Sequence, residues 1–359
     1  MKKFSPGMLA ALLTCLSAVW FMGTYGPLAP YIHSVKERNP EVAAHQPETK
    51  PPPAPENAAA SNKPAVSLRQ WIEEEAEKRR IPPANAVIDR IWKAIPGYAG
   101  REVDIEATYA KAKAAGLAPG APDFPWVYRE VPPAVNLEDL PLAPIYRGNP
   151  AKPMVALMVN VAWGDEHLPA MLDILDQHRV KATFFLDGSW LSKHEAMAKE
   201  ILRRGHELSN HAYSHPDMSR LDLAAQRREI GKTEELLKKL GVKNRWFAPP
   251  SGDYDERTIQ AAGEFGLRTV LWTLDTLDWR NPPAEAIVDK VARKVGPGHL
   301  ILMHPTESSR GALAGIIGAI REKGYLIGTV SETLSSARAE SLAANPSPSD
   351  APSSGPGRS

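Results

Sequence analysis

The sequence between about Lys152 and Ser335 predicts an α/β fold in which a parallel sheet closes as a barrel. Short apolar runs such as 154–159 and 300–303 lack polar alternation, which is typical of strands that are buried on both faces. These runs alternate repeatedly with helical patterns. A chain of 359 residues has room for one such domain, which we place at 149–336, and for accessory segments.

The elements of this domain follow one another in a regular order. The predicted strands are 154–159, 182–186, 207–209, 246–248, 269–274, 300–303 and 326–328. The predicted helices are 168–178, 196–204, 222–240, 256–265, 284–295 and 312–323. In a barrel of parallel strands, the residues just past the carboxyl end of each strand line the active site. The unusual polar residues of this sequence follow strands in this way.

Residues 66–148 predict a small accessory module before the barrel. Ser67 begins a capping-box pattern and a helix, which ends before Pro82-Pro83. A second helix at 105–115 is closed by Gly116. The segment contains neither histidine nor cysteine, so we expect a structural or glycan-facing role for it.

Residues 1–30 predict a signal peptide or a membrane anchor. Lys2 and Lys3 precede a mostly apolar stretch at 8–29, which is about the length that spans a bilayer. No clear small-x-small cleavage pattern follows, which favours the anchor. Both interpretations predict an exported protein, either secreted or held by its N-terminal segment on the outer side of the cytoplasmic membrane.

Composition separates the remaining segments and excludes some functions. Residues 31–65 and 337–359 are rich in Pro, Ala, Ser and Asn, which predicts a disordered linker and a disordered tail. The formal net charge of +1 gives no electrostatic footprint for nucleic acid. The single cysteine, Cys15, excludes an intramolecular disulfide framework.

Two histidines follow the third predicted strand of the barrel. His211 and His215 are four residues apart, so they can share one face of a helical turn and meet a single metal ion. The alternative is a pair of solvent-facing loop histidines. Their position at a strand end favours a metal site.

An aspartate and a third histidine follow two later strands. Asp278 precedes Trp279 after the strand at 269–274, and His304 follows the strand at 300–303. Asp278 can orient this histidine and raise its basicity, which favours a catalytic pair over a structural histidine. The turn at 247–252, which contains Pro249, is expected to line the mouth of the site.

Together these features resemble the polysaccharide deacetylases of carbohydrate esterase family four, over about 154–334. The motifs that carry the resemblance are, in family order, 180–186, 205–217, 278–279 and 302–304. The resemblance implies a distorted (β/α) barrel and a divalent metal, usually zinc. It also implies hydrolysis of N-acetyl groups on chitin-like or peptidoglycan sugars.

The resemblance further implies roles for single residues. His211 and His215 would hold the metal together with an aspartate of the first motif. A second aspartate of that motif would be the base, tethered by an arginine, and His304 would protonate the leaving amine. Asp278 would orient His304.

The sequence departs from the family in the first motif. The family has Thr-Phe-Asp-Asp-Gly where this chain has Met158 to Ala162, so Asn160 replaces the base and Val161 replaces the metal aspartate. Ala248 replaces the tethering arginine, which is consistent because a buried arginine without its carboxylate would be an unpaired charge. The sequence at 160–166 resembles a sporulation-associated branch of the family.

Asp165 and Glu166 follow the changed motif in the same loop. One hypothesis is that Asp165 replaces the missing metal ligand and that Glu166 replaces the missing base. The alternative is that both lie in the first turn of the next helix, where acidic residues suit the helix dipole.

Two functions remain open from the sequence. The first is a metal-dependent deacetylase of cell-wall glycan or chitooligosaccharide, with Trp163 and Trp279 as sugar-stacking faces. The second is a pseudoenzyme that binds cell-wall glycan without turnover, because loss of a general base typically costs about 10²–10⁴-fold in rate.

Overall fold

A parallel sheet of eight strands forms the centre of the computed structural model, which describes residues 66–344. Seven strands follow in the order β10-β11-β5-β6-β7-β8-β9, and β12 pairs with β5. Their bounds are β5 (Met154–Val161), β6 (Thr183–Leu186), β7 (Glu207–Asn210), β8 (Trp246–Phe247), β9 (Arg268–Thr269), β10 (Leu274–Asp275), β11 (Leu300–Met303) and β12 (Leu326–Gly328). The sheet is curled, and the two strands at its ends, β9 and β10, follow one another directly in the chain. The predicted distorted (β/α) barrel is confirmed.

The prediction of one continuous strand at 269–274 is wrong. The segment contains two short strands, because the chain changes partner from β8 to β11 within it. Ile145, which precedes β5, bridges the gap by accepting a hydrogen bond from the amide of Leu271 at 2.8 Å and donating one to the carbonyl of Thr269 at 2.9 Å. The backbone groups at the join are therefore paired outside a regular ladder.

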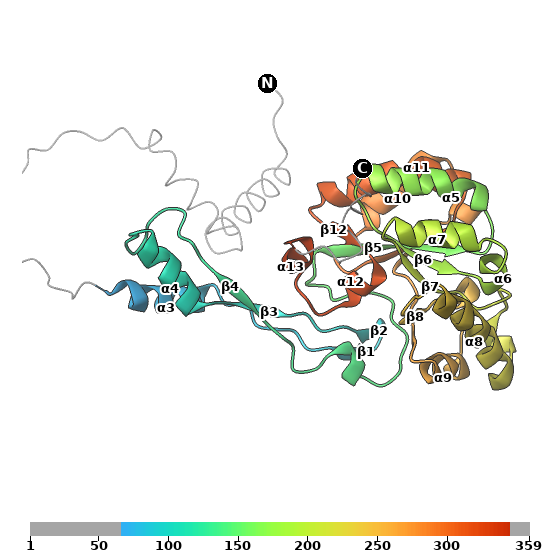
Figure 1. Cartoon of the computed structure of the whole chain (residues 1–359), viewed down its shortest axis with the longest axis horizontal. Coiled ribbons are helices and arrows are strands. Elements are labelled where there is room, and N and C mark those ends of the chain that lie inside the picture. The colour runs from blue at the N-terminus through green and yellow to red at the C-terminus, as the bar shows by residue number, and fades with distance from the viewer. Residues whose placement is uncertain (1–65, 345–359) are drawn as a thin grey trace, which may run out of the picture. The chain divides into compact units, whose positions relative to one another are not determined.

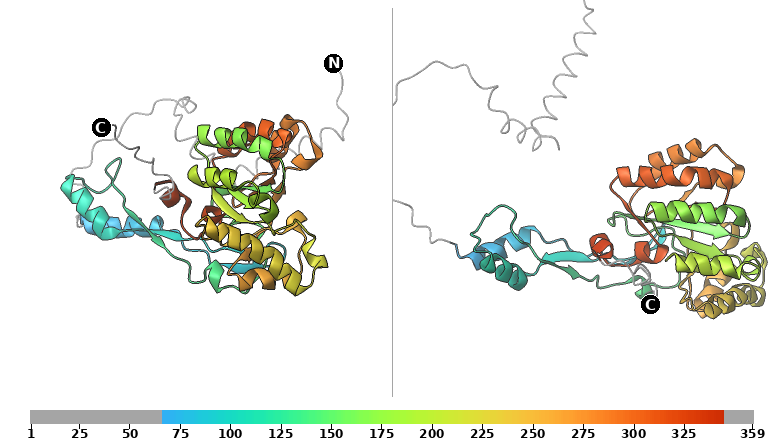
Figure 2. Two further views of the ribbon diagram at one scale, coloured as in Figure 1. Left: turned by 45° about the vertical axis from the view of Figure 1, so that its right-hand side comes forward. Right: turned by 45° about the horizontal axis from the view of Figure 1, so that its top comes forward.

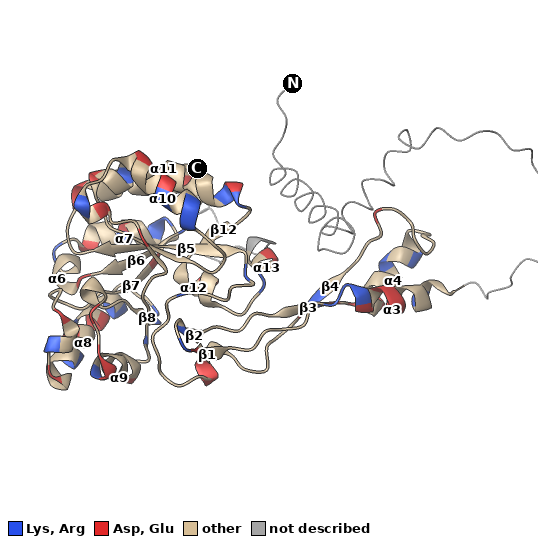
Figure 3. Cartoon of the chain, turned by 180° about the vertical axis from the view of Figure 1, so that it is seen from behind, with Lys and Arg blue, Asp and Glu red and all other residues tan. Residues whose placement is uncertain are grey.

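Helices cover the outside of the strands, as Figures 1 and 2 show. They are α5 (Leu168–Gln177), α6 (Gly188–Leu191), α7 (Glu195–Arg203), α8 (Leu223–Lys239), α9 (Glu256–Glu264), α10 (Ala284–Lys294), α11 (Glu307–Glu322) and α12 (Val330–Leu334). Helix α11 begins five residues before the predicted start at 312, because the side chain of Thr306 accepts a hydrogen bond from the amide of Ser309 and caps it. Figure 3 shows acidic and basic residues interspersed along these helices.

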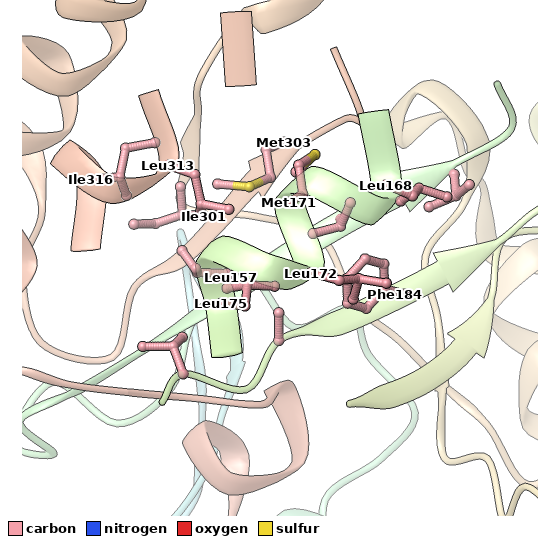
Figure 4. Packing of buried hydrophobic residues seen from close by; sticks show 14 of the residues in the cluster. Leu157, Leu168, Met171, Leu172, Leu175, Phe184, Ile301, Met303, Leu313 and Ile316 are labelled. Carbon is pink, nitrogen blue, oxygen red and sulfur yellow. The ribbon is translucent and has the colours of Figure 1, made fainter. Parts of the chain in front are cut away.

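Two apolar clusters lie on opposite faces of the sheet. The outer cluster joins β5 to α5 and α11 through residues such as Leu157, Leu172 and Ile316, which are labelled in Figure 4. The interior cluster contains Met158 of β5 together with residues of β6, β8 and β11. Successive residues of a strand point to opposite faces. Odd-numbered residues of β5 therefore pack outward, whereas even-numbered residues face the barrel interior.

The segment before the barrel contains a β-hairpin, a second antiparallel pair of strands joined through a helix, and one further helix. Its elements are α3 (Leu68–Lys78), β1 (Val87–Asp89), β2 (Lys93–Ile95), β3 (Gly100–Val103), α4 (Ile105–Ala114) and β4 (Tyr128–Val131). β1 pairs antiparallel with β2, and β3 pairs antiparallel with β4. The predicted capping box at Ser67 is present, and Gly116 adopts the positive φ of 64° that favours glycine after a helix. Both predicted helices are confirmed.

On the C-terminal side the structure describes the chain as far as residue 344. A short helix, α13 (Ala339–Ala344), lies where the sequence predicted the start of a disordered tail. The buried Arg338 before it donates a hydrogen bond to the carbonyl of Ala99 at 3.1 Å, which ties this segment down. Among residues 66–344, no helix is long and apolar enough to cross a membrane. The predicted signal or anchor at 1–30 and the predicted linker at 31–65 lie outside the described residues.

A buried histidine at the start of β7 predicts acid sensitivity of the fold. Burial, with the charges of Lys181 and Arg204, lowers the pKa of His206 to about 3. The unfolded chain binds this proton near pH 6.5, so acid favours the unfolded state, and stability falls as the pH drops below about 6.5. We expect His206 alone to remove about 2 kcal/mol of unfolding free energy at about pH 5.

Urea unfolding of the wild type and of His206→Asn at about pH 7.5 and about pH 5 checks this prediction. The asparagine keeps an acceptor for the amide of Ala182, which lies 3.2 Å from the imidazole Nδ1. The variant should therefore lose less stability between the two pH values. An identical loss in both proteins would contradict the prediction.

Candidate active site

A cavity of about 390 Å³ opens at the carboxyl ends of the barrel strands. It is lined by Asn160, Ala162, Trp163, His211, His215, Ser251, Trp272, Asp275, Trp279, Leu302 and His304. These residues come from β5, β10 and β11 and from the loops that follow β5, β7, β8, β9, β10 and β11. The structure therefore brings six sequence-predicted site residues into one place, namely Asn160, Trp163, His211, His215, Trp279 and His304.

The histidine pair lies on one wall of the cavity. The rings of His211 and His215 are 5.2 Å apart and meet edge to face at 73°. His211 Nδ1 lies 2.7 Å from the carbonyl oxygen of Ala248, which can only accept, so the ring donates there and Nε2 is left as an acceptor. Burial and the neighbouring His215 lower the pKa of His211 to about 3, which keeps this ring neutral near pH 7.

The aspartate and the third histidine form a fixed pair. Asp278 is fully buried, and its Oδ1 lies 2.8 Å from His304 Nδ1. Its Oδ2 accepts from the amide of His304 at 2.5 Å and from the hydroxyl of Ser309. Burial raises the pKa of Asp278, but hydrogen bonds from His304 and Ser309 outweigh it and hold the pKa below its usual range. Trp163 stacks on His304 at 5.8 Å and 7°, so the ring is held from two sides.

The replaced positions of the first motif lie in two different environments. Asn160 is 3% exposed and lines the cavity, and its Oδ1 has no hydrogen-bond partner among residues 66–344. Val161 is fully buried in the outer cluster with Leu168 and Leu186. Ala248 is fully buried in the interior cluster.

The residues present do not fit the divalent metal that the family resemblance implies. Catalytic zinc sites use three protein ligands, and here the third family position holds the apolar Val161. Within 66–344, no three His, Cys, Asp or Glu side chains are grouped so that they could hold a metal ion. His211 and His215 therefore remain a pair of nitrogen donors without a carboxylate.

The hypothesis that Asp165 or Glu166 replaces the missing carboxylate is not supported by the geometry. Both lie in a 3-10 turn, η3 (Asp165–His167), that leads into α5. Asp165 Oδ2 lies 3.6 Å from His194 Nε2, and Glu166 Oε1 lies 3.5 Å from His167 Nε2. Neither lines the cavity, because the turn directs both toward histidines of the neighbouring surface. This position matches the alternative of acidic residues in the first turn of a helix.

Sequence reasoning missed part of the lining and misplaced one residue. Pro249 is buried and does not line the cavity; Ser251, two residues later, does so with a φ of 56°. Trp272 lies within the predicted strand at 269–274, in the gap between β9 and β10, and lines the cavity. Asp275, which also lines the cavity, accepts a hydrogen bond from the amide of Leu277 at 2.8 Å.

Fold and site together define a carbohydrate-deacetylase type of domain. The sequence profile of the polysaccharide deacetylase family matches residues 147–270. The chain is 45% identical over 272 residues to the uncharacterized protein YlxY of Bacillus subtilis, covering 76% of this chain and 84% of that one. A peptidoglycan-N-acetylglucosamine deacetylase of Bacillus cereus is 37% identical over 179 residues, covering 48% of this chain and 65% of that one.

A solved structure agrees over a similar length. BA3943 of Bacillus anthracis, described as a CE4 family pseudoenzyme, has a TM-score of 0.71 and 43% identity, covering 76% of this chain and 96% of that chain. A mutant of BA3943, described as having restored enzymatic activity, has the same TM-score and 42% identity, covering 76% of this chain and 99% of that chain. This chain belongs to the polysaccharide deacetylase family, carbohydrate esterase family four.

Gly164 sets the position of the loop that carries Trp163. Its φ is 78°, and a Cβ there would overlap the carbonyl oxygen of Pro305, next to His304. We expect the positive φ alone to make Gly164→Ala lower the unfolding free energy by about 1–3 kcal/mol. The overlap of the added Cβ with Pro305 should lower it further. Gly241 is the matched control, because it has a φ of 80° with nothing within 4 Å of an added Cβ. Equal losses in Gly164→Ala and Gly241→Ala, measured by urea unfolding, would show that the contact with Pro305 is unimportant.

Proposed function

We propose that this chain is a catalytically silent polysaccharide deacetylase that binds N-acetylated cell-wall glycan in the cavity at the strand ends. The observation that carries the proposal is Asn160, which stands at the base position and lines the cavity. A carboxamide cannot take up a proton near neutral pH, so it cannot activate water. The pseudoenzyme description of BA3943 supports the same conclusion.

The cavity keeps features that suit a sugar ligand. Trp163 and Trp279 are 46% and 48% exposed, and both line the cavity, so each keeps accessible aromatic surface there, although Trp163 also stacks on His304 and Arg280 lies over the ring of Trp279. Aromatic walls with a few polar groups are typical of binding sites for small ligands. The binding partner proposed here is a chitooligosaccharide or peptidoglycan strand, as the name of the Bacillus cereus relative suggests.

Strained backbone around the cavity also favours a retained binding role. His215, Ser251 and Leu277 all have φ values between 56° and 59°. Each such residue costs on the order of 1–3 kcal/mol, and such strain clusters at functional sites. His215 and Ser251 line the cavity directly, and Leu277 lies between Asp275 and Asp278.

A second candidate function is slow hydrolysis, which the intact Asp278–His304 pair favours. The acid side of the family reaction is in place, with Nδ1 of His304 paired to a buried carboxylate. The base side and the metal carboxylate are absent. Turnover in this chain would therefore require a base from elsewhere.

The proposed location is outside the cytoplasmic membrane. It rests on the lysines at positions 2 and 3 and the apolar stretch at 8–29, and on the expectation that the substrate is cell-wall glycan. Attachment to the membrane through this stretch is part of the same proposal. A role in sporulation rests only on the resemblance at 160–166.

Restoring the family residues should restore chemistry. We expect wild type to release no acetate from N-acetylated chitooligosaccharide with added zinc, whereas Asn160→Asp, Val161→Asp and Ala248→Arg combined should release it and bind about one zinc ion per chain. Adding His304→Ala to the triple variant should abolish release. Acetate release by wild type, lost in His304→Ala, would contradict the silent state and establish the second candidate function.

The single variant Val161→Asp tests how a buried carboxylate at this position affects the stability of the fold. Without zinc, its carboxylate would be buried beside apolar residues such as Leu168 and Leu186 with no cation near it, so we expect a loss of about 3–5 kcal/mol in unfolding free energy. In the triple variant, zinc should raise the unfolding midpoint, because it binds the folded state. Thermal unfolding with and without zinc measures both effects, with wild type as the control.

Glycan binding should depend on the aromatic walls. We expect Trp279→Ala to weaken binding of N-acetylated chitotetraose about tenfold, since truncation of a central aromatic contact typically costs more than 1 kcal/mol. Phe265→Ala is the control, because Phe265 is 42% exposed but does not line the cavity. Isothermal titration calorimetry measures the affinities. A wild-type chain that binds neither chitotetraose nor peptidoglycan fragments would contradict the proposed function.

A further inference from the structure

The hairpin of β1 and β2 carries apolar side chains that the fold leaves exposed. Ile91, in the turn, is 66% exposed, the highest value among the large apolar side chains of residues 66–344. Val87 and Ile88 of β1 are each 49% exposed. A single exposed apolar residue needs no explanation, whereas a group of them on one hairpin points to a contact surface.

The structure holds this tip in one conformation. The side-chain Oδ1 of Asp89 accepts hydrogen bonds from the amides of Ile91 and Trp92, both at 2.7 Å, and so fixes the turn. At the base of the hairpin, Ala94 is fully buried in the interior cluster, and its amide donates to the carbonyl of Pro144 at 3.1 Å. The tip is therefore presented to a partner with little loss of conformational entropy on binding.

Positive charges surround the apolar tip. Arg90 and Lys93 lie on either side of it and are exposed. The guanidinium carbon of Arg147 lies 5.5 Å from the centre of the Trp92 ring and adds a third positive charge. Asp89 is the one acidic residue of the hairpin, and its Oδ1 is engaged by two backbone amides. A partner of this tip should therefore be apolar inside and anionic at its surface.

An anionic lipid surface fits these features better than a glycan or a folded protein. Aliphatic side chains offer a sugar neither a hydrogen bond nor an aromatic face. A flat protein surface would cover one side of the hairpin, whereas Val87 and Ile88 face opposite sides of the ribbon. Apolar residues next to tryptophan, lysine and arginine are typical of segments at a membrane interface.

We propose that the tip of the β1–β2 hairpin, residues 87–93, binds the surface of an anionic membrane. Ile91 enters the outer part of the acyl layer, and Trp92 lies at the level of the headgroups. The cationic groups of Arg90 and Lys93 bind lipid phosphates.

This contact acts together with a second attachment. The short tip buries little apolar surface, and stable anchoring of a protein takes two signals. The apolar stretch at 8–29 is the proposed second attachment, and only residues 30–65 separate it from the described chain. The inference therefore rests on the proposed location outside the cytoplasmic membrane. It adds a defined orientation, in which the hairpin faces the lipid.

The experiment places an environment-sensitive dye at the tip of the full chain. Cys15 is the single cysteine, so Cys15→Ser with Ile91→Cys gives one labelled position. Vesicles of phosphatidylcholine with phosphatidylglycerol should raise the emission of a nitrobenzoxadiazole label there more than vesicles of phosphatidylcholine alone. Leu326→Cys in the same background is the matched control, because Leu326 is an exposed apolar residue of β12. The label at 326 should not respond to either lipid.

Substitutions at the tip separate its apolar and its charged parts. With the label moved to Ile88→Cys, Ile91→Ser should weaken the lipid contact about tenfold through loss of apolar burial. Arg90→Gln and Lys93→Gln should each weaken it about fivefold. Replacing the exposed lysines at 238–239 of α8 by glutamine is the control for charge and should leave the contact within about twofold.

The outcomes separate this inference from the proposed location. Flotation of the labelled chain with vesicles measures attachment through residues 8–29, and the dye measures the hairpin contact. A chain that floats with vesicles without a response at 91, or with equal responses at 91 and 326, overturns the inference and leaves the location intact. A response at 91 without vesicles shows that the tip meets protein, and it also overturns the inference. A chain in which the 8–29 stretch gives no attachment overturns that part of the proposed location, and a lipid-dependent response at 91 then supports the hairpin contact by itself.

Discussion

The alternation of side chains along β5 is the constraint on which the site depends. Neighbouring residues of this buried strand point to opposite faces of the sheet, so 160 and 161 lie in different surroundings. Asn160 faces the cavity, whereas Val161 packs in the outer cluster under α5. The two replacements in the first motif therefore have different physical consequences. Valine adds apolar packing and removes a metal ligand, while asparagine keeps a polar acceptor in the cavity and removes the base.

The retained half of the site is held by backbone groups that belong to the barrel. The ring of His211 is fixed by the carbonyl of Ala248, which directly follows β8, and this contact needs only the backbone of residue 248. Asp278 is bound by the amide of His304, which directly follows β11. Both contacts join neighbouring strand ends. The histidine wall and the Asp278–His304 pair can therefore stay in place although the side chains at 160, 161 and 248 have changed.

The sequence predicted the barrel and these retained residues because their signals are local. Short apolar runs mark the strands, and His211, His215, Asp278 and His304 follow strand ends within a few residues. Trp272 could not be predicted, because it lies where the chain passes from Ile145, which is bound by the amide of Leu271, to Leu300, which is bound by the amide of Thr273. The surroundings of Asp165 depend similarly on His194, which follows α5, β6 and α6 in the chain. Long-range contacts of this kind leave no periodic pattern in the sequence.

The three replaced positions are coupled through charge and packing. An arginine at 248 would be a buried charge without a partner while 160 is uncharged, so alanine is the stable companion of asparagine there. At 161 and 248 the chain has apolar residues that match their clusters. At 160 it has instead a polar residue whose acceptor is unmet, although an apolar side chain of the same size would remove that cost. Apolar packing explains the residues at 161 and 248 but not the asparagine, which keeps a polar side chain at the cavity.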